Sequence, residues 1–209
     1  MQWEFLPHDL LPKSTVWDYF VAWQKDGTWQ KMLDTLRGQI RTEAGREETP
    51  SAGCIDTQSV KTTEAGGPRG YDAAKKIKGR KRHALVDTDG RALEVQVQPA
   101  SVQDRDGAPS VLKASRGRFP FIEKAFADGA YAGNTVATAT AIVVQIVRKL
   151  PDQVGFEVLP RRWVVERFFA WINRNRRLAK DFEATIASAK AFLYAACVML
   201  LTRRLARCS

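Results

Sequence analysis

Residues 159–183, which read LPRRWVVERFFAWINRNRRLAKDFE, are the stretch around which the rest of the chain is organised. At 100° per residue, Val164, Phe168 and Trp171 fall on one side of a predicted helix, as core positions do. The acid Glu166 falls on the other side, in a polar and basic stripe. Within about 40° of it lie Arg162, Ala170, Asn173, Arg177 and Lys180. Glu166 is interpreted either as a surface carboxylate beside arginines or as a functional acid.

Composition limits the classes of protein to consider. The chain has 209 residues, is 44% hydrophobic and carries 33 Lys and Arg against 23 Asp and Glu, a net charge of +10. These values predict a globular protein whose partner is a polyanion, either nucleic acid or an anionic membrane surface. No signal peptide begins the chain, and the longest apolar run, residues 191–201, is shorter than the roughly 20 residues of a membrane span, so we expect a cytoplasmic protein. Three widely spaced cysteines indicate free thiols.

Apolar residues at helical spacing predict a small N-terminal helical region, residues 1–50, with Trp17 and Trp29 on its two helices. Gly45 and Pro50 mark a linker at its end. The remainder, residues 51–209, alternates strand and helix patterns and is predicted to form a second, α/β domain.

A basic run follows the first strand of that domain. Residues 69–82 contain seven basic side chains and one acid, Asp72, after a cluster of glycines that predicts a long loop. The run is interpreted either as a solvated surface or as a loop that contacts phosphates. The candidate contacts are Lys75, Lys76, Lys78, Arg80, Lys81 and Arg82.

The stretches RHALVD and RALEVQV, joined by a DTDG turn, predict a β-hairpin, and in the second stretch Leu93, Val95 and Val97 alternate with polar residues. Asp87 and Asp89 are assigned to the chemistry of that turn. His83 has no cysteine or second histidine at ligand spacing, so a structural role is predicted for it. Further on, residues 104–115 predict a helix, and residues 141–147 a strand buried on both faces.

Two aspartates occupy unusual positions in predicted strands. Asp56 lies in the middle of the apolar strand 54–60, where an ionised acid is costly unless it is paired or bound to metal. Asp128 ends a later strand, at the mouth of the sheet. If the two strands are parallel neighbours, these acids lie side by side, and the helix of Glu166 can complete the cluster. Three converging carboxylates need a divalent cation, and oxygen ligands suit Mg²⁺ or Mn²⁺.

Several stretches, in this order, resemble one family. They are CIDTQSVK at 54–61, RGYDAAKKIKGRKRH at 69–83, PASVQDRDG at 99–107, ADGAYAG at 127–133, RRWVVERFFAW at 161–171 and RRLAKDFE at 176–183. Together they resemble the DDE transposases of bacterial insertion sequences, specifically family five of the insertion-sequence classification. The resemblance extends from Gln2 to Glu183.

The resemblance implies a ribonuclease H-like fold, with a mixed five-stranded sheet flanked by helices. It implies that Asp56, Asp128 and Glu166 are both the catalytic triad and the ligands of Mg²⁺ or Mn²⁺, with two ions bound. One ion then activates water and later a DNA 3′-hydroxyl, and the other stabilises the leaving oxygen. The expected activity is cleavage and strand transfer of DNA, the expected partners are inverted-repeat ends and target DNA, and the expected active form is a homodimer or larger.

Some positions depart from the family pattern. Arg162 matches the signature around Glu166 and is a candidate DNA contact, but Leu159 stands where the family has tyrosine, and Asn173 where it has a basic residue. We expect Arg174 or Arg177 to replace that basic residue in contacting DNA ends. The family usually has a further segment before Trp3, so the chain is expected to be short at its N-terminus. The alternative function is a catalytically idle, DNA-binding relic of a transposase.

Overall fold

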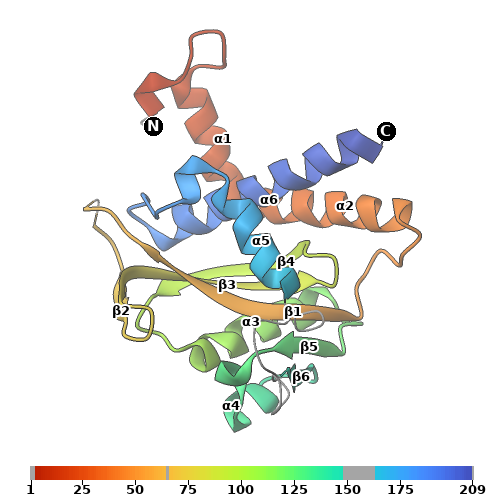
Figure 1. Ribbon diagram of the computed structural model, residues 1–209. Helices are drawn as coiled ribbons and strands as arrows, with labels where there is room; N and C mark the ends of the chain where they lie inside the picture. The colour runs from red at the N-terminus through yellow and green to blue at the C-terminus, as the bar shows by residue number, and fades with distance from the viewer. Residues whose placement is uncertain (1–2, 65, 148–162, 209) are drawn as a thin grey trace.

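The computed structural model describes residues 3–64, 66–147 and 163–208. A mixed sheet crosses the molecule in Figure 1, with one group of helices above it and another below it. The helices are α1 (Lys13–Lys25), α2 (Thr28–Glu43), α3 (Asp104–Arg118), α4 (Asn134–Ala137), α5 (Trp163–Asn173) and α6 (Ile186–Cys208), with 3-10 turns η1 (Trp3–Phe5), η2 (Gly129–Tyr131) and η3 (Arg176–Leu178). The predicted α/β architecture with N-terminal helices is confirmed.

The strands are β1 (Ala52–Lys61), β2 (Gly70–Asp72), β3 (Ile77–Asp87), β4 (Ala92–Pro99), β5 (Lys124–Ala127) and β6 (Val143–Ile146). β3 pairs with β1 along one edge. Its other edge pairs first with β2 and then, from Arg80 onward, with β4, so the short β2 extends the line of β4. The sheet is therefore five strands wide, as predicted for a ribonuclease H-like fold, and β2 is an additional short strand. The pairs of β1 with β5 and of β5 with β6 are parallel.

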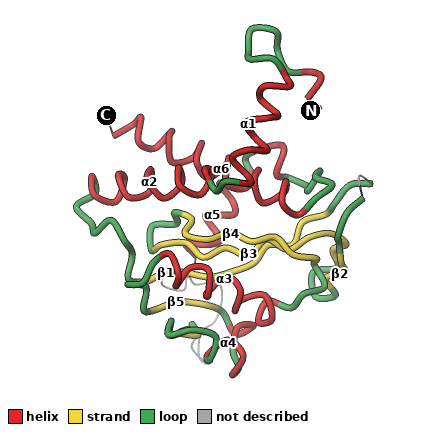
Figure 2. Tube along the Cα trace, turned by 180° about the vertical axis from the view of Figure 1, so that it is seen from behind, coloured by secondary structure: helices red, strands yellow, loops and turns green. Residues whose placement is uncertain are grey.

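The two faces of the sheet bury separate cores, because successive side chains of a strand point to opposite faces. Cys54 of β1 and Phe126 of β5 pack into the core beneath α5 and α6, which also contains Leu33 of α2. Ile55, the neighbour of Cys54, packs into the other core, against α3. Figure 2 shows α3 and α4 on that opposite side. This alternation decides which side chains of β1 face α5.

The strand predicted from residues 141–147 is not buried on both faces. β6 pairs with β5 and is the last strand of the sheet order, and Val143 is 62% exposed. Among the described residues no further strand or helix covers that side chain, so its apolar character reflects strand propensity more than burial.

The helix α6 is long and apolar enough, between Ile186 and Arg207, to cross a membrane by length and composition alone. Core helices satisfy the same criteria, and Leu193, Cys197 and Leu201 are buried in the core beneath it. Cys54 and Cys197 are buried free thiols, in agreement with the prediction.

Candidate functional site

Asp56 lies in β1, and Asp128 directly follows the neighbouring parallel strand β5. The ladder of β1 and β5 pairs Ala52 with Lys124 and Cys54 with Phe126. Continued by two residues along both extended chains, the same register sets Asp56 opposite Asp128, whose backbone is still extended. Because Cys54 and Phe126 face the core under α5, the two aspartates point to that same side of the sheet. The predicted parallel pairing of these two strands is confirmed.

A backbone N–H from the following residues holds each aspartate. Asp56 Oδ1 accepts a hydrogen bond of 2.7 Å from the N–H of Thr57. Asp128 Oδ1 accepts one of 2.9 Å from the N–H of Ala130 and so caps the turn η2. Both side chains are half-buried, at the end of the sheet where the β1–β5 ladder stops. The carboxylates are therefore oriented by local bonds before any ligand binds.

Tyr131 is a neighbour that sequence reasoning missed. Burial raises the pKa of its phenol well above the usual value, and the negative charges of Asp56, Asp104 and Asp128 raise it further. The side chain is only 1% exposed and packs on the α3 side of the sheet. Tyr131 is thus an uncharged phenol near the two aspartates. Its position in the ADGAYAG stretch, three residues after Asp128, could have indicated in the sequence that it lies near the site.

Glu166 lies in the first turn of α5, on an exposed face. At its other end, α5 is tied to the sheet through Arg82, whose Nη1 lies 3.4 Å from Asn173 Oδ1 and 3.3 Å from Gln58 Oε1. Gln58 comes two residues after Asp56 and points to the same face. Glu166 shares a helical stripe with Asn173, about 20° away around the axis. It therefore emerges on the side of α5 that Asn173 presents to β1.

The three acids do not form a preassembled metal cluster. In residues 3–64, 66–147 and 163–208, no group of three or more His, Cys, Asp or Glu side chains is placed to hold a metal ion. The structure brings Asp56 and Asp128 into register and leaves Glu166 on the helix packed over that face. Chemically, an oxygen-only set of ligands fits Mg²⁺ or Mn²⁺, and Asp56 and Asp128 are the two members that lie in β1 and directly after the neighbouring strand β5.

The basic run does not form one continuous loop surface. Arg80, Lys81 and Arg82 belong to β3 and are buried, with 0%, 5% and 2% of their surface exposed. The prediction that these three residues contact phosphates is wrong, because their side chains are buried and bind partners inside the protein. The ammonium of Lys81 lies 2.7 Å from Asp104 Oδ1. Arg82 donates to the carbonyl oxygen of Leu178 at 2.8 Å.

Burial also affects the ionisation of Arg82. It lowers the pKa of Arg82 to about 10, against the opposing effect of the Asp181 carboxylate. Arg82 is still charged at neutral pH, and it uses that charge to hold β3 against the segment after α5.

The other predicted contacts differ in exposure. Exposed ones are Lys75, Lys76, Lys78 and Arg174. Arg177 is half-buried and its guanidinium is paired with Glu183. Arg162 lies outside the described residues. An exposed basic surface therefore remains, on the turn between β2 and β3, at the start of β3 and at the end of α5.

The acids assigned to the hairpin turn have that role. Asp87 Oδ1 accepts hydrogen bonds of 2.9 Å from the N–H groups of Asp89 and Arg91. Its Oδ2 lies 2.9 Å from Nη1 of Arg41, which ties α2 to the turn. His83 is fully buried, as a structural residue would be, and burial lowers its pKa to about 4.

Comparisons with known proteins agree with this arrangement. A family model described as "Transposase DDE domain" matches residues 47–201, which include both aspartates and Glu166. A protein of Brucella ovis named "Putative transposase for insertion sequence element IS6501" is 30% identical over 132 residues, which covers 59% of this chain and 98% of the relative. The strand order, the paired aspartates and the family match lead to one conclusion: the chain belongs to the transposase DDE domain family.

Proposed function

We propose that this protein is a transposase of insertion-sequence family five that cuts the DNA strands at the ends of its element and joins them to a target. The observation that carries the proposal is the parallel pairing of β1 with β5 beneath the helix that bears Glu166. Continued by two residues, this register sets Asp56 opposite Asp128. Two carboxylates held side by side repel each other unless a cation lies between them. The repulsion between such carboxylates destabilises the folded protein, whereas a bound divalent metal relieves it.

In this proposal Asp56, Asp128 and Glu166 hold two divalent cations, Mg²⁺ or Mn²⁺. Bound cations would activate the attacking oxygen and stabilise the leaving one, and no protein nucleophile is needed. The chain itself orients the aspartates through the N–H groups of Thr57 and Ala130. Tyr131 remains protonated below them and adds no negative charge to the site.

DNA is the proposed partner. The net charge of +10 and the exposed side chains of Lys75, Lys76, Lys78 and Arg174 favour a polyanion. An insertion sequence has two ends, so the active complex needs at least two copies of the chain.

Plasmid cleavage tests the proposal. The substrate is a supercoiled plasmid that carries the DNA flanking the coding frame, incubated with Mg²⁺ or Mn²⁺. Asp56→Asn, Asp128→Asn and Glu166→Gln should each abolish metal-dependent nicking. Asp106→Asn, an exposed acid at the start of α3, is the matched control and should nick as the wild type does. Nicking at the wild-type rate by a folded Asp56→Asn protein would refute the assignment.

A second candidate is a protein that binds DNA without cutting it. The exposed side chains of Lys75, Lys76 and Lys78 would serve such a protein equally well. Such a protein would bind DNA with a strong dependence on salt, yet would nick no plasmid in Mg²⁺ or in Mn²⁺.

A further inference from the structure

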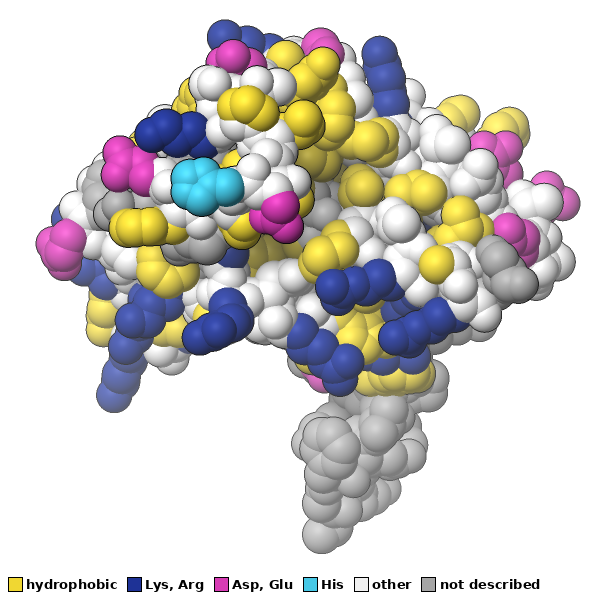
Figure 3. Space-filling model, turned by 90° about the horizontal axis from the view of Figure 1, so that it is seen from above, with side chains coloured by type: hydrophobic (Ala, Val, Ile, Leu, Met, Phe, Trp, Pro, Cys, Tyr) yellow, Lys and Arg dark blue, Asp and Glu magenta, His cyan; other side chains and the backbone are white. Residues whose placement is uncertain are grey.

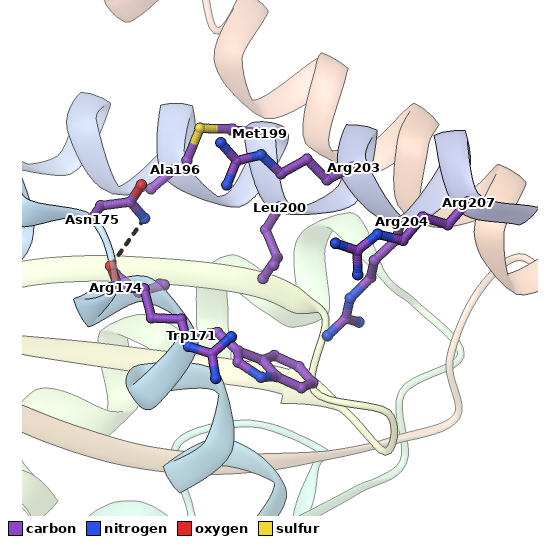
Figure 4. Close-up of a pocket in the computed structure, with 10 residues that line it drawn as sticks. Trp171, Arg174, Asn175, Ala196, Met199, Leu200, Arg203, Arg204 and Arg207 are labelled. Atoms are coloured by element: carbon purple, nitrogen blue, oxygen red, sulfur yellow. Dashed lines mark hydrogen bonds between the residues drawn. The ribbon is translucent and has the colours of Figure 1, made fainter.

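A basic pocket of about 250 Å³ lies between the end of α5 and the C-terminal half of α6, and neither Asp56 nor Asp128 lines it. Four arginines contribute to its lining: Arg174, Arg203, Arg204 and Arg207. None of its described lining residues is acidic. Figure 4 shows arginine side chains from both helices facing the gap between them, with Trp171 beneath. Figure 3, the view from above, shows a group of Lys and Arg side chains gathered around hydrophobic ones.

Three charges of the pocket lack counter-ions in the part of the chain that the structure describes. No carboxylate among those residues forms an ion pair with Arg174, Arg203 or Arg207. By contrast, the neighbouring Arg177 is paired with Glu183. Like charges held close together repel one another, and the repulsion grows as water is excluded. The pocket is thus a region of positive potential that an anion would stabilise.

Trp171 gives the pocket a rigid floor. The guanidinium carbon of Arg204 lies 4.0 Å from the centre of the Trp171 ring, and that of Arg167 lies 4.6 Å from it. Stacking on an aromatic ring restricts a guanidinium while leaving the N–H groups at its edge available. Arg204 is therefore oriented in advance, and its planar fork matches the oxygens of a phosphate.

The pocket adjoins the exposed side of α5 that bears Glu166. Measured around the helix axis from Glu166, Ala170 and Trp171 lie at about 40° and 140°, and Arg174 directly follows the last residue of α5. The helix surface therefore leads from Glu166 to the pocket without crossing the buried face, where Phe168 and Ile172 pack. A DNA strand bound at Glu166 could continue over Arg174 into the pocket.

We propose that this arginine pocket binds the phosphodiester backbone of DNA next to the strand that reaches Glu166. The choice of DNA as the polyanion rests on the proposed function. Arg203, Arg204 and Arg207 follow residue 201, where the family match ends, so the match itself does not assign this site.

Binding measured without divalent metal tests the pocket independently of strand cleavage. Fluorescence anisotropy of a labelled duplex of about 30 base pairs would be followed from about 50 to 200 mM NaCl in EDTA. The double variant Arg203→Gln/Arg207→Gln should flatten the slope of log K against log salt by about 1.8 relative to wild type. The ratio of the variant's Kd to the wild-type Kd should therefore fall about tenfold between about 50 and 200 mM NaCl.

The matched control removes the same charge elsewhere. Lys31 on α2 and Lys113 on α3 are exposed and lie outside the pocket, so Lys31→Gln/Lys113→Gln should keep the wild-type slope. Equal flattening in both double variants would overturn the proposal, because it would mean that only the overall charge matters. An unchanged slope in a folded Arg203→Gln/Arg207→Gln protein would overturn it too.

A second variant tests the geometry of the site. Arg204→Lys keeps the charge but loses the planar group over Trp171, so it should weaken binding about two- to fivefold with the slope unchanged. Wild-type affinity in this variant would contradict the role given to the stacked guanidinium. The outcome is separable from that of the proposed function, because a protein that never nicks plasmid can still give the expected slopes in EDTA.

Discussion

Arg80 and Asp181 form an ion pair in the interior of the protein. Arg80 Nη1 lies 3.1 Å from Asp181 Oδ1, and the two side chains expose 0% and 2% of their surface. The same guanidinium donates hydrogen bonds to the carbonyl oxygens of Pro68 and Glu183. One arginine therefore ties the start of β3 to the loop before β2 and to the segment between α5 and α6.

Removing this guanidinium should lower the stability of the folded protein. Arg80→Ala leaves the Asp181 carboxylate buried without its cation, so the free energy of unfolding should fall by about 3 to 5 kcal/mol. Urea denaturation measures it. Lys78→Ala, two residues away and exposed, is the control and should stay within about 0.5 kcal/mol of wild type. A decrease of less than about 1 kcal/mol in Arg80→Ala would contradict the connecting role.

His83 should make stability depend on pH below neutrality. Burial lowers its pKa in the folded state from 6.5 to about 4. Between these values the unfolded chain takes up a proton that the folded protein does not, so stability falls as pH falls. From pH 7 to pH 5 the decrease should be about 2 kcal/mol.

His83→Leu is the variant to compare, because it removes the titrating ring from a buried site. Urea midpoints at about pH 7 and pH 5 should differ less in the variant than in wild type, by the equivalent of about 2 kcal/mol. Each protein is compared with itself, so any decrease in stability common to both pH values cancels. An equal pH dependence in the two proteins would show that other groups cause it.

The exposed lysines of the β2–β3 turn and of the start of β3 should contribute to DNA affinity. Replacing Lys75, Lys76 and Lys78 should flatten the salt slope by about 0.9 for each phosphate that the variant no longer binds, and so by up to about 2.7. Asparagine is the better replacement for Lys76, whose φ of 52° is left-handed, a conformation that asparagine tolerates. A triple change at Lys25, Lys31 and Lys113 is the charge-matched control. A wild-type slope in the loop variant would mean that the loop is only a solvated surface.

The paired aspartates should matter for metal binding and not for folding. Asp56→Asn and Asp128→Asn each remove one of two adjacent carboxylates, so thermal stability without metal should be equal or slightly higher. Titration calorimetry with Mn²⁺ should show binding to wild type and to Asp106→Asn, and much weaker binding to the two variants. Loss of the folded state in either variant would assign that aspartate a structural role.

Local patterns in the sequence were sufficient to predict several elements. Alternation at Leu93, Val95 and Val97 predicted β4, and helical periodicity located α5 around Glu166. Such signals depend only on the spacing of side chains along one element. Asp56 could likewise be singled out, since an acid in an apolar strand is costly in any fold unless something binds it.

Local patterns in the sequence could not predict which residues of the basic run are buried and which are exposed. Arg80 and Lys78 look alike in the sequence, but Arg80 is buried because Asp181, 101 residues later, comes within reach of it. A charge can be buried only where a partner arrives, and here the partner comes from a distant segment. The position of Glu166 relative to Asp56 depends in the same way on how α5 packs against β1 and β3. Periodicity gives the direction of a side chain around its helix, whereas packing of the core sets the distance of that helix from the sheet.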